Sequence, residues 1–268
     1  LNDLNLIAPD SEGNVLTEVS GGQNAYSLFG FFGRVNYDYK GRYLFEVSAR
    51  YDGTSRFGAG SRWGLFPSGS LGWRISEEPF FAPAKKLVNN LKLRGSYGSL
   101  GNQNVSYYSY LRTINSYYFD SYTFGEGSTK PKYTSLSNPI SDGLTWETSQ
   151  QYNVGLDMAM LNNRLEFTAE AYIRDTKNML TDGDALPGIF GADPPKANSA
   201  DLRTKGYELS LSWRDQINIG GHPFGYSARA TLSDFRSHIT KFDNPDKTFA
   251  KSYYEGMRIG DIWGFQVD

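Results

Sequence analysis

Apolar and polar residues alternate along most of the chain. From Phe31 to Tyr39, and again from Tyr43 to Tyr51, every second residue is apolar or small, and those between are largely polar or charged. A period of two residues is typical of a β-strand whose two faces meet different environments. The Lys40–Gly41 segment between these stretches predicts a tight turn.

The same alternation recurs in six further stretches, and it predicts an all-β, antiparallel fold. Strands are expected near residues 31–39, 43–51, 71–76, 91–98, 151–160, 164–175, 206–214 and 226–233, with a ninth starting near Ile259. A helical turn is expected around residues 84–88. No apolar stretch of the sequence reaches the ~18–20 residues that a transmembrane helix needs.

The connections between the predicted strands alternate in length. Residues 40–41 and 161–163 are short connections, whereas 52–66, 101–145, 176–202 and 239–255 are long. Outer-membrane β-barrels place short turns at one end of the barrel and long loops at the other. The alternation therefore favours a transmembrane β-barrel segment of about eight or nine long strands.

The spacing of aromatic residues supports strands long enough to cross a membrane. Tyr43 and Tyr51 share a face and lie ~26 Å apart along an extended strand. A tilt of ~40° reduces this to about 20 Å along the membrane normal, close to the ~25 Å apolar band of such barrels. The residues predicted to face lipid are Tyr37, Tyr39, Tyr43, Phe45, Val47 and Tyr51. The alternative is a large soluble sheet that buries this face under a second layer.

Composition excludes several functional classes. The formal net charge of -2 provides no field that would attract nucleic acid. The absence of Cys excludes a thiol nucleophile and a Cys-bearing zinc site. The two histidines are not clustered, so neither a transition-metal site nor a cofactor is expected. Asp182-Gly183-Asp184 could lend oxygens to calcium, and a turn rich in Asp and Gly is the alternative interpretation. Glu77–Glu78 and the Glu166/Glu170 pair are interpreted as solvated polar surface rather than as a catalytic acid and base, so the chain is predicted not to be an enzyme.

Several long motifs then occur in the order found in one family. GRVNYDYKGRYLFEVSARYDGTSRFG is followed by RWGLFPSGSLGWRISEEPFF, LKLRGSYGSLGNQ, LTWETSQQYNVGLDMAMLNNRLEFTAEAYIRDTKNML and ANSADLRTKGYELSLSW. This series resembles the barrel of the SusC-like TonB-dependent outer-membrane transporters of Bacteroidota. The resemblance covers most of residues 25–213 and extends more weakly to residue 268.

The resemblance implies a piece of a much larger barrel, with about 22 strands and a plug in its lumen. Residues 1–24 would be a loop remnant at a cut N-terminus and residues 25–268 a partial barrel, with no plug domain in this chain. The family implies import of oligosaccharides or peptides across the outer membrane of a Gram-negative bacterium. It also implies a SusD-like surface lipoprotein as a partner, and TonB through parts absent from this chain.

Two sets of candidate residues follow. The polar wall facing the lumen is expected to include Arg34, Asp38, Arg42, Glu46, Arg50, Arg74, Lys92, Arg94, Glu166, Glu170 and Arg174, where mixed charges keep the lumen wettable and contact a plug. Substrate contact is expected in the aromatic-rich long loop, at Tyr107, Tyr108, Tyr110, Tyr117, Tyr118, Phe119, Tyr122 and Phe124. Sugars stack their C–H faces on such rings. The same aromatics could instead pack on neighbouring loops or on the partner.

Two other hypotheses remain open from the sequence. A soluble glycan-binding or glycan-processing β-sheet domain would use the tyrosine-rich loop as its binding face. A stand-alone eight-stranded barrel would fill its interior with side chains.

Overall fold

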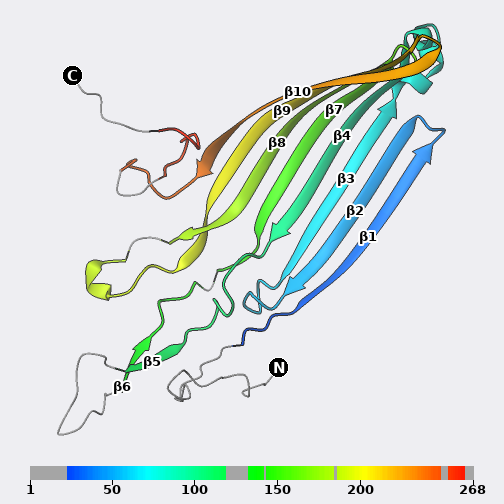
Figure 1. Ribbon diagram of the computed structural model, residues 1–268. Coiled ribbons are helices and arrows are strands. Elements are labelled where there is room, and N and C mark those ends of the chain that lie inside the picture. The colour runs from blue at the N-terminus through cyan, green and yellow to red at the C-terminus, as the bar shows by residue number, and fades with distance from the viewer. Residues whose placement is uncertain (1–22, 119–131, 142, 184–185, 249–252, 263–268) are drawn as a thin grey trace, which may run out of the picture.

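One curved antiparallel sheet makes up most of the protein. The computed structural model describes residues 23–118, 132–141, 143–183, 186–248 and 253–262 (Figure 1). The strands of the sheet are β1 (Leu28–Tyr39), β2 (Tyr43–Thr54), β3 (Trp63–Arg74), β4 (Val88–Asn102), β7 (Glu147–Met160), β8 (Leu165–Asp182), β9 (Lys196–Ile219) and β10 (His222–Lys241). Each strand pairs with the next in that order. Within the described residues β1 and β10 are the two edges, so the sheet is an open wall and not a closed barrel.

A second, smaller sheet stands apart from this wall. It is a two-stranded ribbon formed by β5 (Ile114–Tyr118) and β6 (Lys132–Leu136), inside the long connection between β4 and β7 (Figure 1). The prediction of about eight antiparallel strands in the main sheet is therefore confirmed, with this ribbon added.

The two ends of the wall differ in their connections. At one end, which we call the turn end, Lys40–Arg42, residues 161–164 and Gly220–Gly221 join neighbouring strands. The same end carries three short 3-10 turns, η2 (Ile75–Glu77), η3 (Pro79–Phe81) and η4 (Ala84–Lys86). The opposite end, the loop end, carries the longer connections. The helical turn expected around residues 84–88 corresponds to η4.

The strands extend further toward the loop end than the alternation predicted. Gly53 pairs with Trp63, and Asp182 pairs with Lys196, so two ladders continue into segments expected to be loops. The connections narrow to residues 55–62 and 183–195. Gly53, Gly64 and Pro67 hid the first extension, since both residue types are ordinarily depleted from strands. Register shifts between Thr176 and Leu180 interrupt the alternation in the second.

The ninth strand expected near Ile259 is a short pairing in the described residues. Arg258 forms an isolated bridge with His238. The Ile239 backbone N–H donates to the Met257 carbonyl, and the Ile259 N–H donates to the Ser237 carbonyl, each at 2.9 Å. This segment adds to the sheet alongside the loop end of β10.

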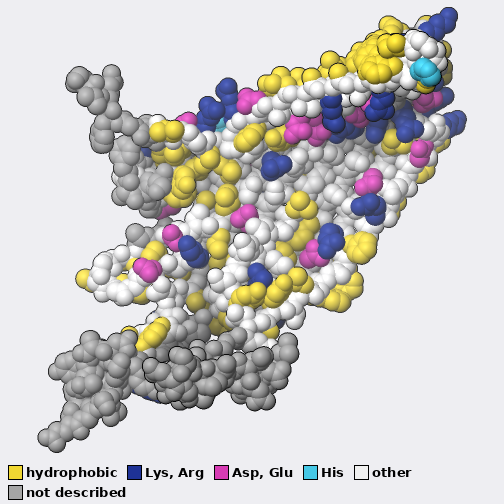
Figure 2. Space-filling view, viewed as in Figure 1, with side chains coloured by type: hydrophobic (Ala, Val, Ile, Leu, Met, Phe, Trp, Pro, Cys, Tyr) yellow, Lys and Arg dark blue, Asp and Glu magenta, His cyan; other side chains and the backbone are white. Residues whose placement is uncertain are grey.

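The strand alternation separates an apolar face from a polar one. The apolar face, which we call the outer face, carries Val35, Leu71 and Val154, whose exposed fractions are 65%, 63% and 61%. No second layer of the described residues covers it. The polar face, which we call the inner face, lies in the hollow of the curved sheet, where Figure 2 shows acidic and basic side chains distributed across it.

Aromatic rings lie near both ends of the outer face. Toward the turn end, the Tyr39 and Tyr43 rings stack with centroids 6.4 Å apart. Toward the loop end, the Tyr51 and Trp63 rings stack at 4.9 Å. The apolar residues of the outer face between these two levels form a belt, which we call the apolar belt.

The main buried cluster of the protein lies at the loop end rather than in the middle of the sheet. Phe57, Phe66, Val105, Leu144 and Trp146 pack together, with Leu180 against them. The Phe66 ring lies over Gly101 of β4, where any Cβ atom would overlap it. Trp146 donates its indole N–H to the Arg62 carbonyl at 3.2 Å, which ties the segment before β7 to the β2–β3 connection.

No helix among the described residues has the length and apolar character needed to cross a membrane.

Candidate functional site

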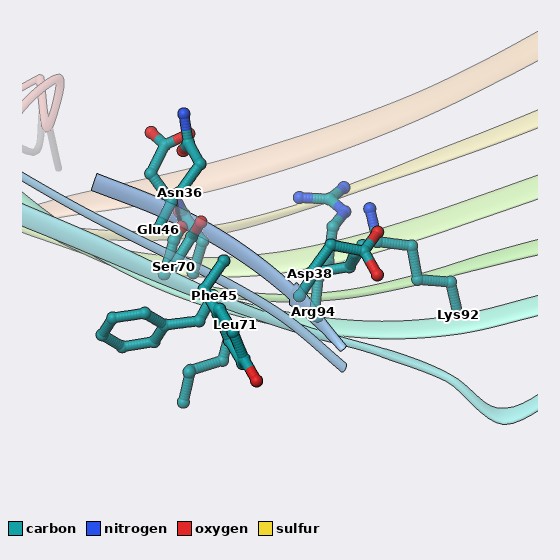
Figure 3. Close-up of a pocket in the computed structure, with 14 residues that line it drawn as sticks. Asn36, Asp38, Phe45, Glu46, Ser70, Leu71, Lys92 and Arg94 are labelled. Carbon is teal, nitrogen blue, oxygen red and sulfur yellow. Dashed lines mark hydrogen bonds between the residues drawn. The ribbon is translucent and has the colours of Figure 1, made fainter. Parts of the chain in front are cut away.

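The candidate polar residues lie together on the inner face. Strand register places Arg34, Asp38, Glu46, Arg50, Arg74, Arg94, Glu166, Glu170 and Arg174 on the same side of the sheet. Figure 3 shows Asp38, Glu46 and Arg94 on this side and Phe45 and Leu71 on the other. The alternation read from the sequence therefore corresponds to two physical faces.

Arg94 is the centre of the best-formed ion-pair network on the inner face. Its Nη2 atom lies 2.7 Å from Oε2 of Glu170, and its Nε atom lies 3.2 Å from Oδ2 of Asp157. These contacts join β4 to β7 and β8. A Cβ atom at Gly155 would lie only 2.6 Å from Cζ of Arg94, so glycine at this position lets the guanidinium lie flat across β7.

A hydrogen-bond relay lies beside this network, nearer the loop end. Arg174 donates to Gln151 at 2.9 Å, Gln151 donates to Asn153 at 2.8 Å, and Asn153 donates to Ser96 at 3.3 Å. Outside the relay, Arg34 and Glu46 approach only to 3.8 Å. The relay and the Arg94 network together order the polar side chains over three strands, β4, β7 and β8.

Arg94, Ser96 and Asn153 of these contacts also line a cavity of about 460 Å³ on the inner face. Asp38, Glu46, Lys92, Arg94 and Asn153 are among the residues that line it (Figure 3). Because both charge signs are present, the wall favours water and polar groups over lipid. The arrangement suits a wettable surface for polar molecules or for a packed protein segment.

A second, larger cavity of about 750 Å³ opens at the loop end. It is lined by residues 104–107, Ser109 and Leu111, by residues 137–141 and Leu144, and by Leu180, Asp182 and residues 193–196. Lys196 pairs with Asp182 at 2.5 Å, and Asn138 donates to Asp193 at 3.2 Å. Mixed charges beside apolar residues such as Leu111 and Leu180 can bind a ligand that has polar and apolar parts.

Asn198 of β9 holds one wall of this loop-end cavity in place. Its Oδ1 accepts from the Thr145 N–H at 3.0 Å, and its Nδ2 donates to the Thr145 carbonyl at 3.0 Å. Nδ2 also donates to the Asn178 carbonyl at 2.6 Å. The Asn198 amide thus makes the backbone hydrogen bonds that a neighbouring strand would otherwise supply. These bonds fix the segment that leads into Trp146.

The described members of the predicted substrate-contacting aromatic set do not gather on one surface. Of these described members, only Tyr107 lines the loop-end cavity. The Tyr108 hydroxyl accepts from the Ala25 N–H at 3.1 Å, and Tyr117 stacks on Tyr133 at 5.4 Å in the β5–β6 ribbon. Tyr110 lies next to Gly58. Phe119, Tyr122, Phe124 and the side chain of Tyr118 lie outside the described residues.

Arg56 fixes Tyr107 where it enters the cavity. Its guanidinium carbon lies 4.7 Å from the Tyr107 ring centroid and 4.3 Å from that of Tyr26. The same guanidinium donates to the Val105 carbonyl at 3.3 Å. Arg56, Asp193, Lys196 and Asn198 carried no signal in the sequence, because their roles arise from contacts between separate segments.

Glu78 organises the turn end. Its Oε1 accepts the Tyr43 hydroxyl at 2.6 Å and the Trp73 indole N–H at 3.0 Å, while Arg42 lies 3.6 Å from Oε2. The hydrogen bond from Tyr43, then that from Trp73, and the nearby Arg42 charge lower the pKa of Glu78 below its usual value. This carboxylate joins β2 and β3 to the 3-10 turns that follow.

The described residues contain no group of three or more histidine, aspartate or glutamate side chains that could hold a metal ion. His222 begins β10 and His238 lies near its other end, so the two histidines occupy opposite ends of one strand.

Comparison with known proteins identifies the family to which this chain belongs. The family model described as "TonB dependent receptor-like, beta-barrel" matches residues 2–262. The chain belongs to this family. The exposed outer face and charged inner face are thus those of a TonB-dependent receptor barrel, and the predicted resemblance to SusC-like proteins is confirmed.

Two relatives show how much of a whole receptor this chain represents. TonB-dependent receptor P3 of Formosa agariphila is 32% identical over 266 residues, which cover 95% of this chain and 26% of the relative. TonB-dependent receptor SusC of Bacteroides thetaiotaomicron is 36% identical over 248 residues, covering 89% of this chain and 23% of SusC. The TonB-dependent receptor chain described here spans about a quarter of the length of these relatives.

A solved structure agrees with the sequence relatives. The RagAB peptide importer in its "closed-closed" state superposes with a TM-score of 0.70 at 27% identity, over 82% of this chain and 23% of the importer chain. The open eight-stranded wall is therefore an arc of a larger barrel, as predicted.

Proposed function

We propose that this chain forms part of the barrel wall of an outer-membrane importer that takes up oligosaccharides or peptides with energy supplied through TonB. The outer membrane would be that of a Gram-negative bacterium. The likeness to SusC and to the RagAB peptide importer supports this class of function. Its partner would be a SusD-like surface lipoprotein.

The proposal rests on the different chemistry of the two faces of the wall, one apolar and exposed and the other charged. A soluble sheet would bury Val35, Leu71 and Val154, yet each is more than half exposed. The free energy of burying an aliphatic side chain is about 1.5–3 kcal/mol, so a belt of such residues needs an apolar environment. Lipid meets this need on the outer face, and water or a plug fills the hollow.

The ends of the wall then have distinct roles. The turn end, with Glu78 and the 3-10 turns, faces the periplasm, because barrels of this kind have short turns there. The loop end faces the cell exterior. Its 750 Å³ cavity, with Tyr107 at its margin, is the proposed contact site for the ligand.

The chain is proposed to be a non-catalytic component. Glu170, which opposes another carboxylate in the strand register, is paired with Arg94. Its neighbour across the ladder, Glu208 of β9, lies on an open wall. This arrangement supports structural and binding roles rather than acid–base chemistry.

Deletion of the full-length gene tests the proposal. The deletion strain should lose growth on one class of oligosaccharide or peptide and regain it when the gene is restored on a plasmid. Membrane fractionation of the tagged full-length protein should place it in the outer membrane, with extraction only by detergent. Unchanged uptake of every oligosaccharide and peptide tested, or extraction by buffer alone, would reject the assignment.

A further inference from the structure

On the outer face, apolar side chains give way to charged ones at the loop-end margin of the apolar belt. On β8, β9 and β10 the belt ends at Ile173, Tyr207 and Leu232. The next outward residues toward the loop end are Asp175, Lys205 and Asp234. Charged side chains thus begin on three adjacent strands, each start offset from the next by two residues in the strand register.

Basic side chains predominate beyond these positions. We call the set Lys177, Arg203, Lys205, Arg236, His238 and Arg258 the basic margin. Register aligns its members: Arg236 opposes Lys205, His238 opposes Arg203, and Arg258 opposes His238. Figure 2 shows basic side chains gathered with a histidine at this end of β10.

The acidic groups on the same surface leave much of this positive charge uncompensated. Asp175 accepts two hydrogen bonds from Arg203, at 2.6 and 2.9 Å, and lies close enough to Lys177 and Lys205 to interact with both. Asp234 lies beside the margin, and Asp201 opposes Lys241 one level further out. Among the described residues, Lys205, Arg236 and Arg258 form no ion pair.

This juxtaposition suits an amphiphile with a phosphorylated head. Neighbouring strands lie ~4.8 Å apart, so Lys205 and Arg236 present donors within the span of one phosphate group. Toward the turn end, Tyr207 is the next outward residue after Lys205 on β9, and Leu232 follows Arg236 on β10 after Asp234; both offer apolar surface to acyl chains. A soluble anion would contact only the charged part of this surface and would leave its apolar part unoccupied.

The position of the margin identifies the source of the phosphate. The margin lies on the outer face, whereas the inner-face cavity and its lining side chains lie on the opposite side of the sheet. A polar substrate moving through the hollow does not reach it. A lipid in the surrounding leaflet does.

We infer that the basic margin is a binding site for the phosphorylated headgroup of an outer-leaflet lipid, with Lys205, Arg236 and Arg258 as its principal ligands. The inference relies on the outer-membrane orientation proposed above. It does not depend on which nutrient is imported.

Lipid binding by the full-length protein tests this inference. The protein, purified in detergent, is titrated with monophosphorylated lipid A and with the same lipid lacking its phosphate, and bound lipid is counted by native mass spectrometry. The variant is Lys205→Gln/Arg236→Gln/Arg258→Gln. The matched control, Arg34→Gln/Arg74→Gln/Lys92→Gln, makes the same change in charge on the inner face.

The expected result is selective loss of phosphorylated lipid. Each basic residue near an anionic lipid surface contributes roughly five-fold in affinity, so the outer triple variant should weaken binding on the order of 100-fold. The inner triple variant should bind as the unmodified protein does. The charge-conserving variant Lys205→Arg/Arg236→Lys/Arg258→Lys should retain binding, and it remains informative if the triple glutamine variant fails to fold.

Three outcomes would overturn the inference. They are undiminished binding in the outer triple variant, equal loss in both triple variants, and equal binding of the lipid without phosphate. Displacement of the lipid by millimolar inorganic phosphate would instead identify a site for soluble anions and would also reject it. Extraction without detergent would overturn the membrane orientation itself, whereas these binding results concern the lipid site alone.

Discussion

Arg94 of β4 reaches across β7 to Glu170 of β8, and its Nη2 atom lies 2.7 Å from the Glu170 carboxylate. Arg94 therefore contacts two strands beyond its own, since Asp157 of β7 also pairs with it. Both side chains of the Arg94–Glu170 pair are about a quarter exposed, at 29% and 23%. The hollow of the sheet is thus held by partly desolvated charge pairs as well as by backbone ladders.

A double-mutant cycle on Arg94→Gln and Glu170→Gln should show coupling. We expect about 1 kcal/mol in the free energy of unfolding of the full-length protein, because the pair is only partly desolvated. The coupling should shrink in 1 M salt. Arg34→Gln with Glu46→Gln is the control, and its longer, more exposed contact should give no measurable coupling. Equal coupling in both cycles would contradict the special position of Arg94.

Gly101→Ala should destabilise the loop end. The new Cβ would overlap the buried Phe66 ring, and overpacking of this kind typically costs about 1–3 kcal/mol. Gly95→Ala on the same strand is the control, since its Cβ would have ordinary contacts at 3.8 Å and beyond. Thermal unfolding of the two full-length variants measures the difference, and equal unfolding temperatures would refute the predicted clash.

Leu211→Lys should impair assembly of the protein in the membrane. Leu211 lies on the outer face of β9 between Trp213 and Tyr207, and a lysine near the middle of a lipid-facing belt costs about 2–4 kcal/mol. Ser212→Lys, one residue along on the inner face, should be tolerated. Heat-modifiability on gels reports the folded fraction of each. Equal folded fractions would argue against lipid on the outer face.

The Glu78 contacts predict a pH dependence at the turn end. Because the pKa of Glu78 is lowered in the folded protein, its contribution to stability is complete above the ordinary glutamate pKa and is lost as pH falls through the folded value. Glu78→Gln should lower the unfolding temperature at neutral pH and remove part of this acid sensitivity. Glu77→Gln, which loses an exposed pair with Lys85, should behave like the unmodified protein.

Asn198→Ala should loosen the wall of the loop-end cavity. The substitution removes all three hydrogen bonds from the side chain to Thr145 and Asn178, so limited proteolysis near residues 137–145 should accelerate. Ligand uptake should fall while the unfolding temperature changes little. Asn218→Ala, at the exposed turn end of the same strand, should alter neither property. Unchanged proteolysis in Asn198→Ala would show that other contacts hold the wall.

The period of two residues was sufficient to predict which face each strand residue occupies. Phe45 and Glu46 lie on opposite faces as expected, because successive side chains of a strand must alternate (Figure 3). Strand ends were less accessible to prediction. Pro67 lies inside β3, opposite Ala49, although proline usually marks an edge or an end of a strand.

The loop-end site was the least predictable part. The density of tyrosines pointed to residues 107–124, yet the described aromatics there pack on other rings of the protein, such as Tyr26 and Tyr133. The bonds from Asn198 to Thr145 join residues more than fifty positions apart. Side-chain periodicity contains no information about such contacts.

The unequal strand lengths make the rim of the wall oblique. Beyond Tyr51, β2 continues only to Thr54, whereas β9 continues from Tyr207 to Lys196, roughly 36 Å at ~3.3 Å per residue. Among the described strands, those of the β8–β10 flank therefore project further beyond the apolar belt than those of the β1–β3 flank. A partner that docks on these strand ends would sit at an angle to the wall.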